Sequence, residues 1–134
     1  MRKSMISVVS AVILAISGIA FAGGGARAPL STSELKQTIG AHGKATLVFF
    51  LNPKGGPCQE QQGILDKLLR DRQGNFNIAK VSALIQDDQK AFYDYGIRSL
   101  PALVLVDKSG GIARVFPPGI QTEATLNAAL DRVK

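Results

Sequence analysis

The chain is poor in the residues that most often do chemistry. Its 134 residues include one cysteine, Cys58, one histidine, His42, and no tryptophan. A single cysteine cannot form a disulfide within the chain, so the fold must be stabilised by its hydrophobic core. One histidine cannot build a metal site alone, and no two carboxylates are spaced convincingly for acid–base catalysis. We therefore expect no metal and no cofactor.

Charge is also weakly patterned. Sixteen basic and ten acidic residues give a net charge of +6, and the basic residues are scattered singly along the chain. A nucleic-acid interface usually gathers its basic residues on one face or in one run. The scattered pattern is typical of a solvated surface, and we expect no nucleic-acid partner.

The start of the chain has the pattern of a signal peptide. Arg2 and Lys3 precede an apolar run, and Ala20-Phe21-Ala22 places small residues at both positions that determine cleavage. Serines and a glycine interrupt the run, which barely reaches the ~20 apolar residues that a membrane span needs. We expect cleavage after Ala22 and a periplasmic or secreted protein. The alternative is an uncleaved N-terminal membrane anchor.

Three segments are therefore predicted along the chain. They are a signal peptide over 1–22, a flexible, glycine-rich linker over 23–30, and a domain over 31–134. The chain beyond the signal peptide is long enough for one compact core and too short for two.

Hydrophobic periodicity predicts alternating helices and strands in the domain. The expected helices cover 32–40, 58–72, 87–95 and a last segment beginning after Thr122, and the expected strands cover 46–51, 76–81, 102–106 and 112–116. A Ser-x-x-Glu capping box at 31–34 and a capping aspartate at 87 mark two helix starts. A helix joins the first two strands, which makes them parallel, and a short turn joins the last two into a hairpin. The fold class is α/β, a small mixed sheet with helices on both faces.

Two motifs resemble those of the thioredoxin family. The apolar strand at 47–50 leads into Gly-Gly-Pro-Cys at 55–58, and the chain later reads Tyr-Gly-Ile-Arg-Ser-Leu-Pro at 95–101. Together with the order of elements, the resemblance covers essentially the whole domain. It implies a thioredoxin fold with Cys58 at a helix start and Pro101 as the cis-proline that faces the loop.

Three positions depart from the family pattern. Gly55 stands where the family has its nucleophilic cysteine, Lys54 where it has tryptophan, and Phe49 where thioredoxins bury an aspartate. A single thiol can attack a disulfide, but it cannot resolve the mixed disulfide without a second thiol. We therefore expect no ordinary disulfide reductase activity.

Opposing effects act on the remaining thiol. A helix start favours the thiolate of Cys58, and Lys54 could add a favourable charge, whereas burial favours the neutral thiol. The sequence alone leaves open whether Cys58 is reactive.

Two functions remain open, and the retained Pro57-Cys58 pair at a helix start favours the first of them. In the first, Cys58 forms a mixed disulfide with an exported protein or a small thiol, which a periplasmic or membrane thiol reductant resolves; a disulfide-linked dimer through Cys58 belongs to this hypothesis. In the second, the domain is a non-catalytic module that holds a peptide in a groove between the loop and the proline. The residues predicted to line that groove are Lys54, Gly55, Gly56, Pro57, Leu100 and Pro101.

Overall fold

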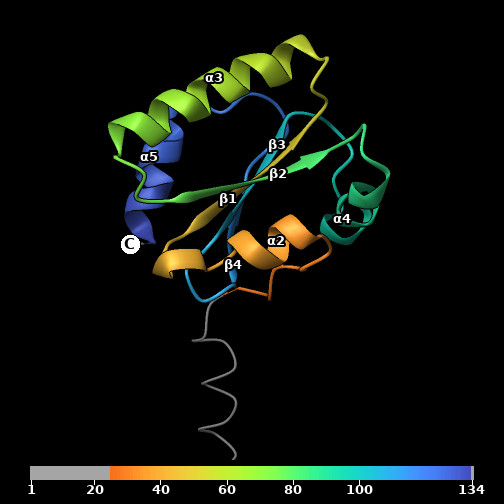
Figure 1. Cartoon of the computed structure of the whole chain (residues 1–134). Helices are drawn as coiled ribbons and strands as arrows, with labels where there is room; N and C mark the ends of the chain where they lie inside the picture. Colours follow the sequence, from red (N-terminus) through yellow and green to blue (C-terminus); the bar gives the residue numbers. More distant parts are fainter. Residues whose placement is uncertain (1–24, 134) are drawn as a thin grey trace, which may run out of the picture.

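The computed structural model describes residues 25–133, and the predicted signal peptide over 1–22 lies outside them. The strands are β1 (Thr46–Leu51), β2 (Asn77–Ser82), β3 (Ala102–Val106) and β4 (Ile112–Val115). The α-helices are α2 (Ser33–Thr38), α3 (Gly56–Asp71), α4 (Gln89–Tyr95) and α5 (Glu123–Arg132), and two 3₁₀ turns are η1 (Ala41–Gly43) and η2 (Gln86–Asp88). Figure 1 shows the sheet between two layers of helices.

The four strands form one mixed sheet in the order β2-β1-β3-β4. β1 pairs in parallel with β2 and antiparallel with β3, which in turn pairs antiparallel with β4. This confirms the predicted α/β class and its division into a parallel half and a hairpin. All six residues of β1 are buried, as expected for a central strand that is covered on both sides.

Successive residues of β1 point to opposite faces of the sheet. Leu47 and Phe49 enter a core with the apolar side chains of α3 and α5, and we call this side the α3/α5 face. Val48 and Phe50 enter a second core with residues of α2 and α4, which we call the α2/α4 face. The two helix layers lie on opposite sides of the sheet (Figure 1).

The predicted capping box at the start of α2 does not form. Thr32, not Ser31, caps the helix, because its hydroxyl accepts a hydrogen bond from the Leu35 N–H at 3.1 Å. The Glu34 carboxylate accepts instead from the backbone N–H of Lys80 at 2.6 Å. The glutamate that the local sequence pattern predicted for the helix cap thus makes a tertiary contact instead.

The predicted start of α4 is also shifted. Residues 86–88 form η2, and α4 begins only at Gln89 with no side-chain cap. The carboxylate of Asp88 accepts from the backbone N–H of Ser82 at 2.8 Å. At the other end of the chain, Thr122 caps α5 as predicted, accepting from the Thr125 N–H at 3.2 Å.

The segment predicted as a flexible linker packs on the fold from Ala26 onward. The Ile112 N–H donates to the Ala26 carbonyl at 2.7 Å, and the Ala28 N–H donates to the Gly110 carbonyl at 2.9 Å. Ala28 is buried, and the Tyr95 hydroxyl donates to the Pro29 carbonyl at 2.7 Å. The short apolar residues of this segment follow neither helix nor strand periodicity, so the sequence did not predict that the segment packs beside the β3–β4 hairpin.

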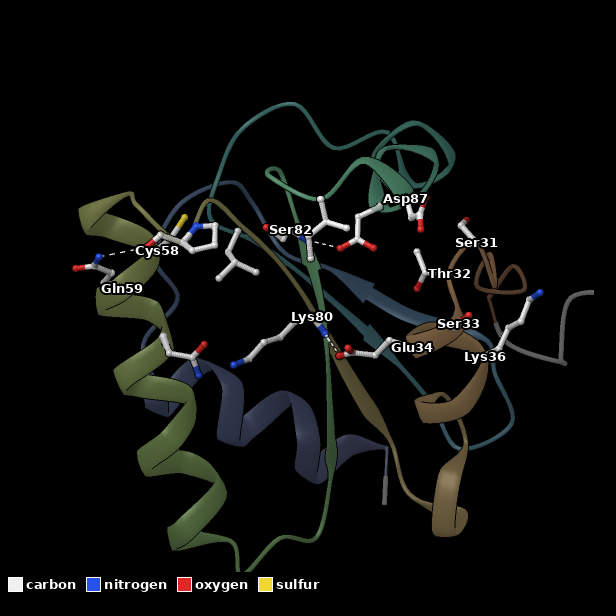
Figure 2. Close-up of a pocket in the computed structure, with 15 residues that line it drawn as sticks. Ser31, Thr32, Ser33, Glu34, Lys36, Cys58, Gln59, Lys80, Ser82 and Asp87 are labelled. Atoms are coloured by element: carbon white, nitrogen blue, oxygen red, sulfur yellow. Dashed lines mark hydrogen bonds between the residues drawn. The ribbon is translucent and has the colours of Figure 1, made fainter.

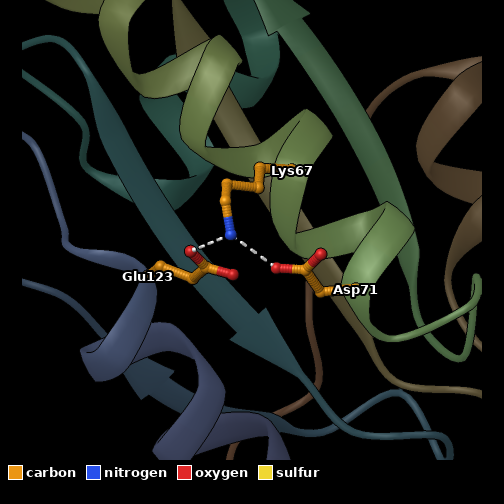
Figure 3. A network of polar contacts seen from close by, with 3 residues as sticks. All are labelled: Lys67, Asp71 and Glu123. Atoms are coloured by element: carbon orange, nitrogen blue, oxygen red, sulfur yellow. Dashed lines mark hydrogen bonds and ion pairs between the residues drawn. The ribbon is translucent and has the colours of Figure 1, made fainter.

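Charged side chains connect α3 to α5 at the surface. The Lys67 Nζ lies 2.7 Å from the Asp71 carboxylate, one turn along α3, and 3.2 Å from that of Glu123 at the start of α5 (Figure 3). Hydrogen bonds to both carboxylates raise the pKa of Lys67. Exposed pairs of this kind contribute little to stability because solvent screens them, so the two helices are held mainly by the core between them.

Candidate functional site

A tight turn delivers the chain from β1 to the start of α3. The Gly55 N–H donates to the Asn52 carbonyl at 2.9 Å, and the Lys54 N–H donates to the Asn52 side-chain oxygen at 3.0 Å. Pro57 lies in the first turn of α3, where a missing backbone N–H costs nothing. Lys54, Gly56 and Pro57 are exposed on this loop.

Cys58 follows in the first turn of α3, but its thiol does not face the solvent. The residue is only 3% exposed and packs into the core of the α3/α5 face. Its Sγ accepts a hydrogen bond from the backbone N–H of Asn52 at 3.3 Å. The structure thus answers the question of exposure that the sequence left open, because the thiol of Cys58 is buried.

Glycine at position 55 is not required by the backbone. Its φ of −85° and ψ of 132° are open to any residue. An added Cβ would lie 3.4 Å from the Asn52 carbonyl oxygen and 3.8 Å from the Cys58 Sγ, which are ordinary contacts. At Gly56 an added Cβ would meet no atom within 4 Å. The loop therefore has room for a second cysteine, and its absence is a chemical difference rather than a steric necessity.

Phe49 lies beneath this site. It is fully buried in the same core as Cys58. Within residues 25–133 the buried polar side chains are Thr46, Gln61 and Ser82, so no buried carboxylate of that range is available to move a proton to or from the thiol.

The peptide bond between Leu100 and Pro101 is cis. Pro101 is buried, and its carbonyl accepts from the Gly119 N–H at 3.0 Å. Leu100 is half-buried and packs against the cluster that contains Cys58. Among residues 25–133, no hydrogen bond engages the backbone groups of Ser99 or Leu100, which leaves this edge available.

The largest cavity described does not lie on that edge. It has a volume of about 970 Å³ and opens on the other side of the loop, between α2 and α3 along β2 (Figure 2). Of the predicted site residues only Cys58 lines it, together with Leu51, Pro53 and Gln59 around the thiol. The remaining predicted residues form the exposed loop and the proline edge instead.

Gln61 is a site-supporting residue that the sequence did not reveal. It is fully buried on α3, its side-chain NH₂ donates to the Gln121 carbonyl at 3.1 Å, and its oxygen accepts from the Gln121 N–H at 2.7 Å. This pair fastens the segment before α5, whose Gly119 bonds to Pro101. The only signal was spacing, because Gln61 falls between Cys58 and Leu65 on the buried stripe of the helix.

Comparison with known proteins identifies the family. A family model described as Thioredoxin matches residues 27–132. The chain belongs to the thioredoxin family. The thioredoxin of Pseudomonas aeruginosa is 33% identical over 76 residues, which cover 57% of this chain and 67% of that protein. The family predicted from the two motifs is thereby confirmed.

Two solved structures share the thioredoxin fold. Fasciola hepatica thioredoxin superposes with a TM-score of 0.57 at 23% identity, covering 69% of this chain and 83% of that one. A structure described as a malarial protein superposes with a TM-score of 0.58 at 16% identity, covering 67% of this chain and 97% of that one. At these identities the likeness concerns the fold alone.

Metal ligands and membrane-spanning helices are both missing from residues 25–133. In this range no three His, Cys, Asp or Glu side chains gather as ligands for a metal ion. No helix of the range is both long and apolar enough to cross a membrane.

Proposed function

We propose that this thioredoxin-like protein binds an extended segment of a client protein beside its 52–58 loop, without a dithiol reaction cycle. The burial of Cys58 carries the proposal, because the only thiol of the chain is 3% exposed and has no second thiol beside it. A thiol must reach a disulfide sulfur to attack it. The sequence alone placed single-thiol chemistry first, and this burial reverses the order.

The proposed docking edge is the backbone of Ser99 and Leu100. Its N–H and C=O groups are unbonded within the described chain, and an extended segment could satisfy them as a neighbouring strand does. Lys54 is exposed on the adjacent loop and would favour an acidic client segment. Consistent with the predicted signal peptide, we place this activity in the periplasm or outside the cell.

Site-specific crosslinking tests the proposal. A photo-crosslinking amino acid at exposed Ser99 is expected to trap a defined client, whereas the same group at exposed Lys108 should not. Leu100→Asp should remove the Ser99 crosslink, because a carboxylate would face an acidic segment, and Cys58→Ser should leave it unchanged. Equal crosslinking from both positions would contradict a specific edge.

One observation supports a second function. Cys58 borders the 970 Å³ cavity, so a small disulfide could approach from that side even though a protein could not. The thiolate would then form a mixed disulfide and release one thiolate, and a thiol reductant in the same compartment would regenerate Cys58 by forming the second disulfide. A disulfide-linked dimer through Cys58 requires greater exposure of the thiol than the structure has.

Native-state labelling separates the two functions. If the thiol is inaccessible in the folded protein, a bulky disulfide reagent should label Cys58 only after unfolding, and the crosslink at Ser99 should persist. If small-thiol chemistry operates, labelling by a small reagent should proceed in the folded protein and Cys58→Ser should abolish it. Rapid labelling of the folded protein by both reagents would return single-thiol chemistry to first place.

A further inference from the structure

β2 forms an outer edge of the sheet, and half of its backbone groups face away from β1. The Asn77 N–H donates to the Ala45 carbonyl at 2.8 Å, and the Ala83 N–H donates to the Leu51 carbonyl at 2.9 Å. Along a parallel strand these inward groups alternate with outward ones. The N–H and C=O groups of Ile78 and Lys80, and the N–H of Ser82, therefore point outward, where no strand of residues 25–133 pairs with them.

Two carboxylates occupy this edge in place of a neighbouring strand. Glu34, from α2, accepts from the Lys80 N–H at 2.6 Å, and Asp88, from η2, accepts from the Ser82 N–H at 2.8 Å. The two amides lie two residues apart, which is the spacing at which the carbonyls of an added strand would accept. Figure 2 shows the Glu34 side chain reaching from α2 toward Lys80 of β2.

The same edge forms the floor of the 970 Å³ cavity. The N-terminal end of α2 lies on one side of β2, and α3 with Gln59 lies on the other (Figure 2). Gln62 of α3 also lines the cavity. Ile85, which is 52% exposed, adds an apolar contact where the strand ends. A strand edge that is capped only by two side chains and lies between two helical walls is the shape that accepts one extended segment rather than a second folded sheet.

We propose that this β2-edge groove binds a lysine- or arginine-containing extended segment of a partner protein as an added strand. The carbonyls of that segment would replace the carboxylates of Glu34 and Asp88 on the two amides. The displaced carboxylates, together with Asp87 in the same groove, would then pair with the basic side chains of the segment. Lys36 and Lys80 also line the groove, so three carboxylates face two ammonium groups and the net charge of the lining stays negative. This site is separate from the Ser99 and Leu100 edge and does not depend on the function proposed there.

Charge complementarity and backbone pairing can be tested with defined peptides. The ¹⁵N-labelled full-length protein is titrated with an acetylated, amidated octapeptide that alternates valine with lysine, and with a matched peptide that carries glutamate in place of lysine. The lysine peptide should shift the amide signals of Ile78, Lys80 and Ser82 saturably. It should bind about threefold more tightly than the glutamate peptide, because the three carboxylates of the groove outnumber its two lysines.

Two changes separate the contribution of backbone pairing from that of charge. N-methylation of alternate peptide bonds should abolish binding, because it removes the donors that face β2. The double variant Glu34→Gln, Asp88→Asn keeps two acceptors but removes two charges and leaves Asp87 against Lys36 and Lys80, so the preference for lysine should be lost. Glu60→Gln removes a charge from the exposed face of α3 outside the groove and should leave the preference unchanged.

Other outcomes overturn the proposal. No saturable shift up to millimolar peptide, shifts confined to residues outside the groove, or equal binding of the N-methylated peptide would each exclude strand addition here. Glu34 and Asp88 would then act only to protect an exposed sheet edge against pairing.

Discussion

The two faces of the sheet are built differently. The α2/α4 face packs aromatic rings edge to face, with Phe50 lying 5.4 Å from Phe92 and 5.2 Å from Tyr95 between ring centroids. The α3/α5 face instead buries a thiol and an amide, Cys58 and Gln61, among aliphatic side chains. One face is a purely structural core, whereas the other is the core on which the candidate site rests.

The difference shows how the fold can be kept with a single cysteine at the site. Phe49 and Phe50 are neighbours on β1, yet only Phe49 lies beneath the loop that holds Cys58. An apolar ring there strengthens the core and leaves no group for proton transfer. The framework around the site, including the start of α3 and the Pro101 edge, is kept without a dithiol.

The strongest test of this contrast places the family's acid back into the α3/α5 face. Phe49→Asp should destabilise the protein by more than about 4 kcal/mol, because it removes a fully buried ring and buries an unpaired charge. Urea denaturation, followed by circular dichroism, measures the change in the free energy of unfolding.

Phe49→Leu is the matched control for that variant. It keeps an apolar side chain and should cost only about 1 kcal/mol. A folded Phe49→Asp protein of near-normal stability would show that the core beneath the loop admits solvent or a counter-charge.

The second test removes the buried amide of the same face. Gln61→Ala should cost about 2–3 kcal/mol, since it opens a small cavity and leaves the Gln121 N–H and carbonyl without their partners. The same denaturation experiment measures it. Gln62→Ala, one position along α3 and less buried, should cost less than about 0.5 kcal/mol, and equal losses would deny Gln61 a special role.

The third test restores the missing thiol. Gly55→Cys should form a disulfide with Cys58 and stabilise the oxidised protein by roughly 2 kcal/mol relative to its reduced form. Insulin reduction by the unmodified protein should show no turnover, while Gly55→Cys should gain measurable turnover that stays below that of a thioredoxin because Phe49 remains.

Gly56→Cys separates a restored motif from an added thiol. An added Cβ at position 56 would meet no atom within 4 Å, whereas one at position 55 would lie 3.8 Å from the Cys58 Sγ, so the Gly56→Cys variant should stay inactive. Turnover by the unmodified protein, or equal activity of both variants, would contradict the interpretation of Gly55.

Features governed by short-range pattern could be predicted from the sequence. The unbroken apolar run at 46–51 identified the central strand, and Thr122 identified the start of α5. The two motifs at 55–58 and 95–101 identified the family. Each of these signals lies within a few consecutive residues.

Features governed by distant partners could not be predicted. Glu34 had the correct spacing for a local cap, but the Lys80 amide on β2 binds it instead. The burial of Cys58 depends on the residues that pack around the start of α3, and the β2-edge groove depends on a strand having no outer neighbour. None of these features produces a periodic pattern in the sequence.

The smallest expected effect tests the α2/α4 face, where Tyr95 ties the aromatic cluster to the N-terminal segment. Its hydroxyl donates to the Pro29 carbonyl at 2.7 Å, and Tyr95→Phe should cost about 1 kcal/mol at pH 7. Burial raises the pKa of Tyr95 to about 12, above its ordinary value of 10.0, so the fold favours the neutral phenol. That contribution is fully present below pH 10 and is lost as the pH rises through about 12.

The difference in unfolding free energy between the wild type and Tyr95→Phe should therefore be constant from pH 7 to about pH 9 and shrink above about pH 10. Tyr93→Phe is the matched control, because Tyr93 lies on the same helix and is 87% exposed. It should change stability by less than about 0.5 kcal/mol at every pH. If the Tyr95→Phe difference did not decline at high pH, the packing of the α2/α4 face would not be what keeps the Tyr95 hydroxyl neutral. The aromatic cluster would then not set this face apart from the α3/α5 face.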